Sequence, residues 1–345
     1  MKRTGTRVVR TFGRRQTVGW AAALVTAVAL MPLLLVRGEP LYVRETKGVS
    51  VENRPAGDLA EPLAAARDRG KAVRLQMADG TVAELTMADY LWSVVAAEMP
   101  ASFEEEALKA QACAARTYTL IQQGLGKHEG ADLCADSTCC QAYVERETAL
   151  ARWGLNAGEY EDKITRAVAE TDGLGVLYGG KPIQALFFSS AAGQTVDAVA
   201  VWGNSLDYLV SVDSPEGEEV PNYTSQVVLA AQQVKDLTLA AYPGADLSGE
   251  ASGWFGNVQR SGQTVTSLAL GGVTLTGGQV RKLFSLRSAA FTVDCDGTNF
   301  VFNVTGYGHG VGMSQYGANA LAGEGKTFRD ILTWYYTGTE VDYLW

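Results

Sequence analysis

Residues 86–124 read TMADYLWSVVAAEMPASFEEEALKAQACAARTYTLIQQG, and this stretch predicts two consecutive helices. Thr86 is a suitable N-cap for the first helix because Asp89 follows three positions later, in the spacing of a capping box. Pro100 closes this helix, since a proline disfavours helical geometry at the residue before it. We therefore expect Glu98 to lie in the last turn of the first helix.

The second predicted helix begins at Ser102, with Glu105 at the matching capping-box position, and Gly124 is a suitable C-terminal stop. Its middle is rich in small residues, namely Ala107, Ala110, Ala112, Ala114 and Ala115. Small side chains let a helix approach a neighbour closely, so this helix is expected to pack tightly against another element.

The rest of the chain predicts mainly strands. Alternating residues on either side of Asp79-Gly80 predict a hairpin over 73–85. Further β-rich runs cover Val176–Tyr178, Ile183–Phe188, Gln226–Leu229, Val265–Leu270, Phe291–Val293 and Phe300–Val304. Phe328–Tyr336 predicts a final helix, which Gly338 ends. Helices grouped at the front, followed by runs of strands, indicate an α+β architecture rather than a βαβ repeat.

The N-terminal segment has the pattern of a membrane anchor. Six basic residues within positions 1–17 precede an uncharged apolar run from Val18 to Val36, closed by Arg37. That run is long enough to span a bilayer, and the basic residues favour a cytoplasmic N-terminus with the remainder outside. A cleaved signal peptide is the alternative, although no small-x-small cleavage site follows the run.

These features divide the chain into a cytoplasmic tail over 1–17, a transmembrane helix over 18–37, a juxtamembrane stalk over 38–70 and a folded domain over 71–345. The stalk ends in a short predicted helix over Leu59 to Arg67. The net charge of the whole chain is -9, and the part after the predicted anchor is more acidic still. Such a balance excludes non-specific nucleic-acid binding as the main function.

Three of the five cysteines lie close together beside one of the two histidines: the cluster is His128, Cys134, Cys139 and Cys140. Thiolate and imidazole ligands suit a tetrahedral zinc ion. Because Cys139 and Cys140 are adjacent, we expect only three of the four to bind one ion, with water or a distant group completing the shell. The alternative is a disulfide between Cys134 and Cys140, as exported proteins often have.

Glu98 is the residue most suited to acid-base chemistry. A carboxylate at the C-terminal end of a helix faces the negative end of the helix dipole, which raises its pKa, more so in a dry site. A raised pKa lets a carboxyl group act as a general acid near neutral pH. The alternative is an ordinary solvent-exposed glutamate in a terminal turn. Two polar stretches, 188–195 and the glycine-dense 306–317, are candidates for the rim of a cleft or for simple turns.

Three motifs together resemble the stage II sporulation protein D family. They are Ala97-Glu98-Met99-Pro100, residues 106–112 running into Ala115-Arg116-Thr117-Tyr118, and Gly308-His309-Gly310-Val311-Gly312-Met313-Ser314-Gln315. The resemblance runs from about Lys71 to the end of the chain. It implies a two-lobed α+β domain with a central cleft. It also implies a peptidoglycan lytic transglycosylase that acts in forespore engulfment, with an amidase/endopeptidase and a membrane protein as partners.

By position, the resemblance makes Glu98 the catalytic glutamate. The polar residues that it implies for substrate binding are Arg116, Tyr118, Ser189, Thr195, His309, Ser314 and Gln315. His128, Cys134 and Cys140 match the zinc motif of the sporulation-specific branch, and Cys139 stands where a histidine is common. The zinc would be structural, because a closed thiolate-rich site has no open coordination position.

The implied reaction needs only one carboxylate. Glycoside hydrolases usually use two, whereas a lytic transglycosylase uses one group as acid and then as base, and leaves a 1,6-anhydro-muramic end. Two other classes stay open. One is an amidase-activating module of the same family, and the other is a structural anchor that binds glycan without cutting it.

Overall fold

The computed structural model describes residues 66–203 and 205–345, which all belong to one compact unit. The predicted tail over 1–17, the predicted transmembrane helix over 18–37 and the stalk up to residue 65 lie outside the described residues. In the part of the chain that is described, no helix has the length and apolar character needed to cross a membrane.

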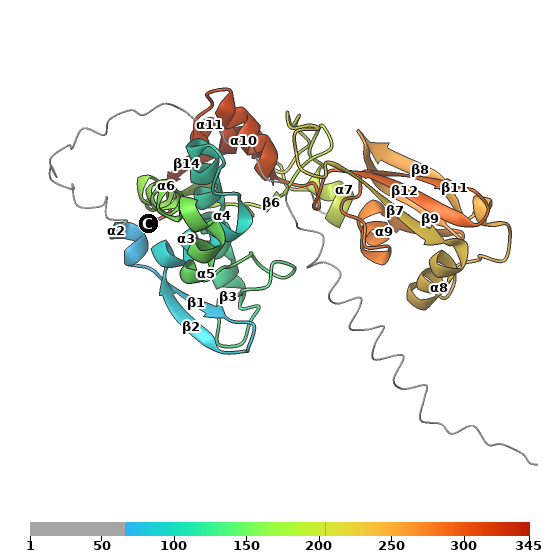
Figure 1. The fold of residues 1–345 in the computed structure, drawn as a ribbon, viewed down its shortest axis with the longest axis horizontal. Coiled ribbons are helices and arrows are strands. Elements are labelled where there is room, and N and C mark those ends of the chain that lie inside the picture. The colour runs from blue at the N-terminus through green and yellow to red at the C-terminus, as the bar shows by residue number, and fades with distance from the viewer. Residues whose placement is uncertain (1–65, 204) are drawn as a thin grey trace, which may run out of the picture. The chain divides into compact units, whose positions relative to one another are not determined.

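The N-terminal part of the fold confirms the predicted hairpin and the first helix (Figure 1). After the short helix α2 (Ala66–Arg69), strands β1 (Ala72–Gln76) and β2 (Val82–Thr86) pair antiparallel, and β3 (Leu133–Cys134) joins β1 in parallel. Helix α3 (Met87–Glu98) starts as predicted, because the Thr86 hydroxyl accepts a hydrogen bond from the Asp89 amide. It also ends at Glu98.

The predicted ends of the second helix are wrong by a few residues. Helix α4 (Glu105–Leu125) has Glu104 as its N-cap, not Ser102. A turn in which the Phe103 amide donates to the Pro100 carbonyl comes first, and the Glu104 amide is held by the Asn319 side chain. At the other end the chain stays helical through Gly124, because Gly126 adopts the left-handed conformation (φ 60°) that stops the helix.

Helix α4 lies at the centre of the first hydrophobic core. It contacts α3, α6 (Ala157–Glu170), α10 (Gln315–Gly323) and α11 (Phe328–Tyr335), and α5 (Arg146–Trp153) packs on α3 and α6 (Figure 1). Its alanines at 107, 110, 112, 114 and 115 are fully buried, so the small side chains allow the predicted close packing. A sheet of order β14-β4-β5, with β4 (Leu174–Tyr178), β5 (Lys181–Pro182) and β14 (Glu340–Tyr343), completes this region.

A second hydrophobic core lies between two three-stranded sheets and their helices. One sheet has the order β11-β12-β7 and the other β10-β9-β8. The elements are β7 (Thr224–Ala230), α8 (Ala231–Ala241), β8 (Phe255–Ser261), β9 (Thr264–Leu270), β10 (Val273–Thr276), α9 (Gly277–Leu283), β11 (Phe291–Cys295) and β12 (Asn299–Thr305). Phe300 and Phe302 are buried in this core, because alternate residues of a strand face the same side.

Several sequence predictions need correction. Most of the expected strand Ile183–Phe188 is irregular: only β6 (Phe187–Phe188) is extended, pairing in parallel with β13 (Met313–Ser314). The Ala185 and Leu186 amides each bond two residues back, so the apolar run is buried as tight turns rather than as a strand. Helices are also not confined to the front, since α8 to α11 lie in the second half of the chain. The α+β class is confirmed, and the two-lobed arrangement stays a prediction.

The short elements between these regions are α7 (Ala198–Trp202) and the 3-10 turns Gly154–Asn156 and Ala251–Gly253. The start of the domain also differs from the expected Lys71. Asp68 in α2 is fully buried and forms an ion pair with Arg116 at 2.6 Å, so the described fold includes residues assigned to the stalk.

Candidate functional site

Glu98 is held in place by two hydrogen bonds from distant parts of the chain. Its Oε1 accepts from the Ala142 amide at 2.7 Å, and its Oε2 accepts from the Gln315 side chain at 3.1 Å. Burial raises the pKa of Glu98, although both hydrogen bonds lower it because they favour the charged form. The predicted direction of the shift is confirmed, with desolvation as its main cause.

Glu98 lines a cavity of about 1390 Å³. Five of the eight expected catalytic and substrate-binding residues line this cavity: Glu98, Tyr118, Ser189, His309 and Gln315. They come from α3, α4, the segment after β6, the glycine-dense motif and the start of α10. The tertiary structure therefore brings together polar residues that are more than 200 positions apart in the sequence.

Arg116 does not line the cavity, which corrects its assignment to substrate binding. Its side chain is fully buried, and its Nε and Nη2 groups donate to both oxygens of Asp68 while Nη1 donates to the Leu174 carbonyl. Residues two apart on a helix point to different faces, so Arg116 faces the core while Tyr118 faces the cavity. Arg116 is a structural residue that ties α2 and β4 to α4.

Thr195 and Ser314 are also outside the cavity lining. The Thr195 hydroxyl accepts from the Val212 amide at 2.9 Å, and the side chain is buried. Ser314 is fully buried and caps α10, where its hydroxyl accepts from the Gly317 amide at 3.2 Å. Both residues shape the loops that carry the lining residues.

A buried glutamate that sequence reasoning missed supports the same loops. Glu216 accepts hydrogen bonds from the Ala191 amide at 2.6 Å, from the Ser214 hydroxyl at 2.6 Å and from the Ser314 hydroxyl. Ser214 in turn bonds the Tyr335 hydroxyl at 2.7 Å. Glu216 thus joins the segment after β6 to the start of α10 and to α11. No local pattern marks this role, because the Ala191 and Ser314 groups that Glu216 joins are 25 and 98 residues away from it.

His309 is fixed as a neutral ring in the cavity wall. Its Nε2 faces the Phe187 carbonyl at 3.1 Å, and its Nδ1 accepts from the Val311 amide at 3.2 Å. A carbonyl requires a proton on Nε2, and an amide donor requires a lone pair on Nδ1. Burial, together with the nearby Arg281, lowers the pKa of His309 to about 4, so the ring is uncharged near neutral pH.

The glycine-dense motif needs glycine at Gly312 in particular. Its φ of 81° lies in the left-handed region, and a Cβ there would clash with the Leu186 carbonyl oxygen. A glycine therefore lets the backbone of the motif pass close to the segment before β6. In this structure that approach is to the protein's own chain.

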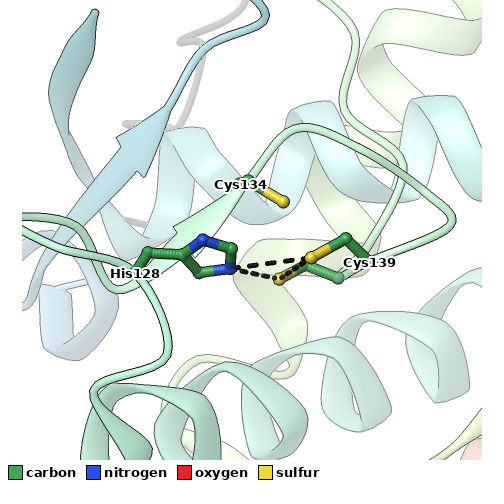
Figure 2. A group of neighbouring side chains, drawn as sticks. His128, Cys134 and Cys139 are labelled. Atoms are coloured by element: carbon green, nitrogen blue, oxygen red, sulfur yellow. Dashed lines mark hydrogen bonds between the residues drawn. The ribbon is translucent and has the colours of Figure 1, made fainter. Parts of the chain in front are cut away.

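The cysteine cluster gathers into one group (Figure 2). The ligand atoms of His128, Cys134, Cys139 and Cys140 all lie within 4.8 Å of one another. His128 Nε2 is 3.2 Å from the Cys140 sulfur and 3.8 Å from that of Cys139, and the two sulfurs are 4.0 Å apart. A tetrahedral zinc ion with bonds of about 2.0 to 2.3 Å needs ligand separations of this size.

These distances correct the expectation that only three of the four side chains reach one ion. The adjacent Cys139 and Cys140 both point to His128, because a turn after Asp136 brings their amides back to the Asp136 carbonyl. All five cysteines of the chain are free thiols in the structure, so the Cys134–Cys140 disulfide is not formed. The four residues fit a metal ion, and zinc is the ion that their chemistry favours.

The same loop reaches the catalytic candidate. Cys139, Cys140 and Ala142 line the cavity, and Ala142 is the residue whose amide bonds Glu98. Lys127 adds a second restraint, because its ammonium group donates to the Cys139 carbonyl at 2.7 Å. A metal ion at the cluster would therefore hold a loop that places a hydrogen-bond donor on Glu98.

Fold and site together define an α+β protein in which one glutamate of raised pKa and a four-ligand Cys/His cluster border a large cavity. Comparison with known proteins identifies the family. Residues 77–178 match the family described as stage II sporulation protein. Stage II sporulation protein D of Bacillus subtilis (strain 168) is 34% identical over 93% of this chain and 94% of that protein, and the Bacillus amyloliquefaciens protein is 31% identical over the same shares. The chain belongs to the stage II sporulation protein D family.

A more distant relative has a different name. The amidase enhancer of Bacillus subtilis (strain 168) is 29% identical over 72% of this chain, which corresponds to 40% of that longer protein. The resemblance stated from the three sequence motifs is thus confirmed at the level of the family.

Proposed function

We propose that this protein is a peptidoglycan lytic transglycosylase that cleaves the bond between N-acetylmuramic acid and N-acetylglucosamine. The observation that carries this proposal is the position of Glu98. Among the described residues that line the cavity, Glu98 is the one carboxylate, and its pKa is raised. A hydrolase of the usual kind would need a second carboxylate in the same cavity.

One carboxyl group is sufficient for an intramolecular reaction. Glu98 in its protonated form donates its proton to the glycosidic oxygen as the bond from that oxygen to C1 of the muramic residue breaks. The C6 hydroxyl of the same residue then bonds to C1, and its proton returns to Glu98. The product is a 1,6-anhydro-muramic end, and no water is consumed.

The hydrogen bonds to Glu98 suit both halves of this cycle. Burial favours the protonated acid at the start, whereas the Ala142 amide and the Gln315 side chain stabilise the carboxylate that forms in the middle. The neutral His309 does not compete as an acid, because its pKa of about 4 leaves it unprotonated near neutral pH. We assign sugar binding to four polar residues that line the cavity, His309, Tyr118, Ser189 and Gln315.

We assign a structural role to zinc at His128, Cys134, Cys139 and Cys140. Zinc bound by four protein ligands has no open position for substrate or water, so it supplies folding energy rather than Lewis acidity. The loop that it would hold carries Ala142, and the amide of Ala142 positions Glu98.

The setting that we propose is the outer face of the cell membrane during forespore engulfment. The apolar run from Val18 to Val36 and its basic flank support a single-pass anchor, and the relatives named stage II sporulation protein D support a role in sporulation. Glycan strands are the proposed substrate. An amidase/endopeptidase and a membrane protein are the proposed partners, and the acidic chain makes nucleic acid an unsuitable one.

A second function, activation of an amidase without cutting glycan, is favoured by the similarity to the amidase enhancer. Mass analysis of peptidoglycan digested by the purified protein separates the two. The proposed enzyme leaves 1,6-anhydro-muramic ends, an ordinary hydrolase leaves reducing ends, and an amidase activator leaves the glycan uncut. Uncut glycan under conditions in which the protein is folded would refute the transglycosylase.

A further inference from the structure

The wall of the cavity that belongs to α9 and the following loop is strongly basic. Arg281 and Lys282 are in the last turn of α9, and Arg287 follows in the loop; all three line the cavity that Glu98 lines. We call these three residues the cationic wall. With Glu98 as the one acid among the described lining residues, the cavity is positive within a chain whose net charge is -9.

The described part of the chain forms no ion pair with this wall. In residues 66–203 and 205–345, no carboxylate oxygen lies within 4.0 Å of a side-chain nitrogen of Arg281, Lys282 or Arg287. Other arginine and lysine side chains in the same part of the chain do form ion pairs. Basic residues at a helix C-terminus are favourable to the helix dipole, which explains a preference for Arg281 and Lys282 at that end of α9. The dipole does not explain Arg287, which lies four residues beyond the end of the helix.

Arg281 and Arg287 are fixed in place. Arg281 Nε donates to the Arg287 carbonyl at 3.0 Å, and the Arg287 guanidinium lies over the Tyr307 ring at 4.3 Å from its centre. The Nε of Arg287 is buried and has no hydrogen-bond partner among the described residues. A buried donor without a partner is costly, so a ligand that accepts from Arg287 would gain a hydrogen bond that the protein itself leaves unmade.

We propose that the cationic wall binds a carboxylate of the substrate strand while Glu98 acts on the glycosidic bond. This inference rests on the proposed function for the identity of the strand. Guanidinium groups bind carboxylates through paired charge-assisted hydrogen bonds, which fix orientation as well as affinity. Two parts of peptidoglycan carry such a group. They are the lactate side chain of a muramic residue without a stem peptide, and the free carboxylates of the stem peptide where one is attached.

Binding measurements with uncut ligands test this proposal. The full-length protein in detergent carries Glu98→Gln, and isothermal titration calorimetry compares three strands of equal length: peptide-free glycan, peptide-bearing glycan and a chitooligosaccharide, which has no carboxylate. The expected result is that one of the two carboxylate strands binds about tenfold more tightly than the chitooligosaccharide, as charge-assisted hydrogen bonds allow. Preference for the peptide-free strand assigns the lactate carboxylate, and preference for the peptide-bearing strand assigns the stem peptide.

Arg287→Gln and Lys282→Gln should remove this preference, and Arg287→Lys should restore part of it because the charge is kept and the planar fork is lost. Lys326→Gln is the matched control, since Lys326 is exposed in the loop between α10 and α11 and does not line the cavity. Thermal melting of each variant shows whether it folds. Raising the salt concentration should weaken the binding of the carboxylate strands and leave the binding of the chitooligosaccharide unchanged.

Two results would overturn the proposal. One is that all three strands bind with equal affinity. The other is that the variants of the cationic wall lose as much affinity for the chitooligosaccharide as for the carboxylate strands. Failure of the proposed function is distinguished from this by the digestion assay. If the protein without Glu98→Gln leaves glycan uncut while the carboxylate preference is present, the transglycosylase is refuted and the cationic wall stands. Cleavage to 1,6-anhydro ends without the preference refutes the wall alone.

Discussion

Replacing Glu98 by glutamine should separate catalysis from folding. Glutamine has nearly the same shape but no transferable proton, so cleavage should fall by at least about a hundredfold, the lower end of what general acid catalysis contributes. The contacts of Glu98 predict a small cost to the fold. The new amide oxygen can still accept from Ala142, and the new NH₂ group would face the Gln315 NH₂ group.

A flip of the Gln315 amide relieves that conflict. Its oxygen then accepts from the introduced glutamine. The Gln111 amide has to flip as well, because its Oε1 now accepts from the Gln315 NH₂ group at 3.4 Å; its Nε2, which is buried without a hydrogen-bond partner among the described residues, can then donate to the Gln315 oxygen. The exchange therefore replaces one set of neutral hydrogen bonds by another, and the free energy of unfolding should change by no more than about 1 kcal/mol at acidic pH.

The pH dependence of stability gives this prediction a second, independent readout. Burial raises the pKa of Glu98 in the folded protein, so the folded state binds its proton more tightly than the unfolded state does. The resulting stabilisation is complete below the ordinary glutamate pKa and is lost as the pH rises through the folded-state value. Glu98→Gln carries no ionisable group at this position and does not lose this stabilisation. The melting temperature of the variant, relative to that of the unmodified protein, should therefore increase as the pH rises through this window.

The assay is release of 1,6-anhydro-muramic products, measured by mass spectrometry, alongside thermal melts over a pH series. Glu218→Gln is the matched control, because Glu218 is exposed and does not line the cavity. The rate of cleavage should also fall as the pH rises through the raised pKa, since the acid must start protonated. Full activity in Glu98→Gln would refute the assignment, and a melting difference independent of pH would refute the burial of its charge.

Four further predictions concern the metal, the core, the loops and the membrane. Purified protein should contain about one zinc per chain by elemental analysis. The variants Cys134→Ser and Cys140→Ser should lose this zinc and melt at a lower temperature, and a chelator should have the same effect on the unmodified protein. Metal-free protein with a Cys134–Cys140 disulfide would contradict this prediction. Arg116→Gln should destabilise the fold by about 3–5 kcal/mol in denaturant titrations, because Asp68 is left buried without its partner; unchanged stability with weaker glycan binding would return Arg116 to the substrate site. Glu216→Ala should lower the melting temperature and raise KM, because three donors lose their acceptor and the loops beside Ser189 and Gln315 loosen. Glu216→Gln keeps one acceptor oxygen and should have a smaller effect. An alanine variant with the properties of the unmodified protein would refute the role of Glu216 in holding these loops. Protease added to intact protoplasts should digest nearly the whole chain if residues 18–37 span the membrane with the N-terminus inside, and full protection would refute that orientation.

The features that the sequence predicted well are those that neighbouring residues decide. The Thr86 cap, the end of α3 at Glu98, the hairpin β1–β2 and the helix α11 all depend on contacts within a few positions. The end of α4 is set locally by Gly126, whereas the error at the start of α4 has a tertiary cause. The side chain of Asn319 holds the Glu104 amide from 215 residues away, which no local pattern could indicate.

The sequence by itself determined the family of the protein and pointed to Glu98 as the candidate catalytic acid. Both depend on the order of the motifs and on the types of residue in them, which are properties of the chain alone. Only the tertiary structure decided which polar residues face the cavity. Arg116 and Tyr118 are two positions apart in one motif, yet the turn of α4 sends one into the core and the other to the cavity. The environment of Glu98 likewise depends on Ala142 and Gln315, the latter 217 residues away, because burial and hydrogen bonding arise only when distant segments pack together.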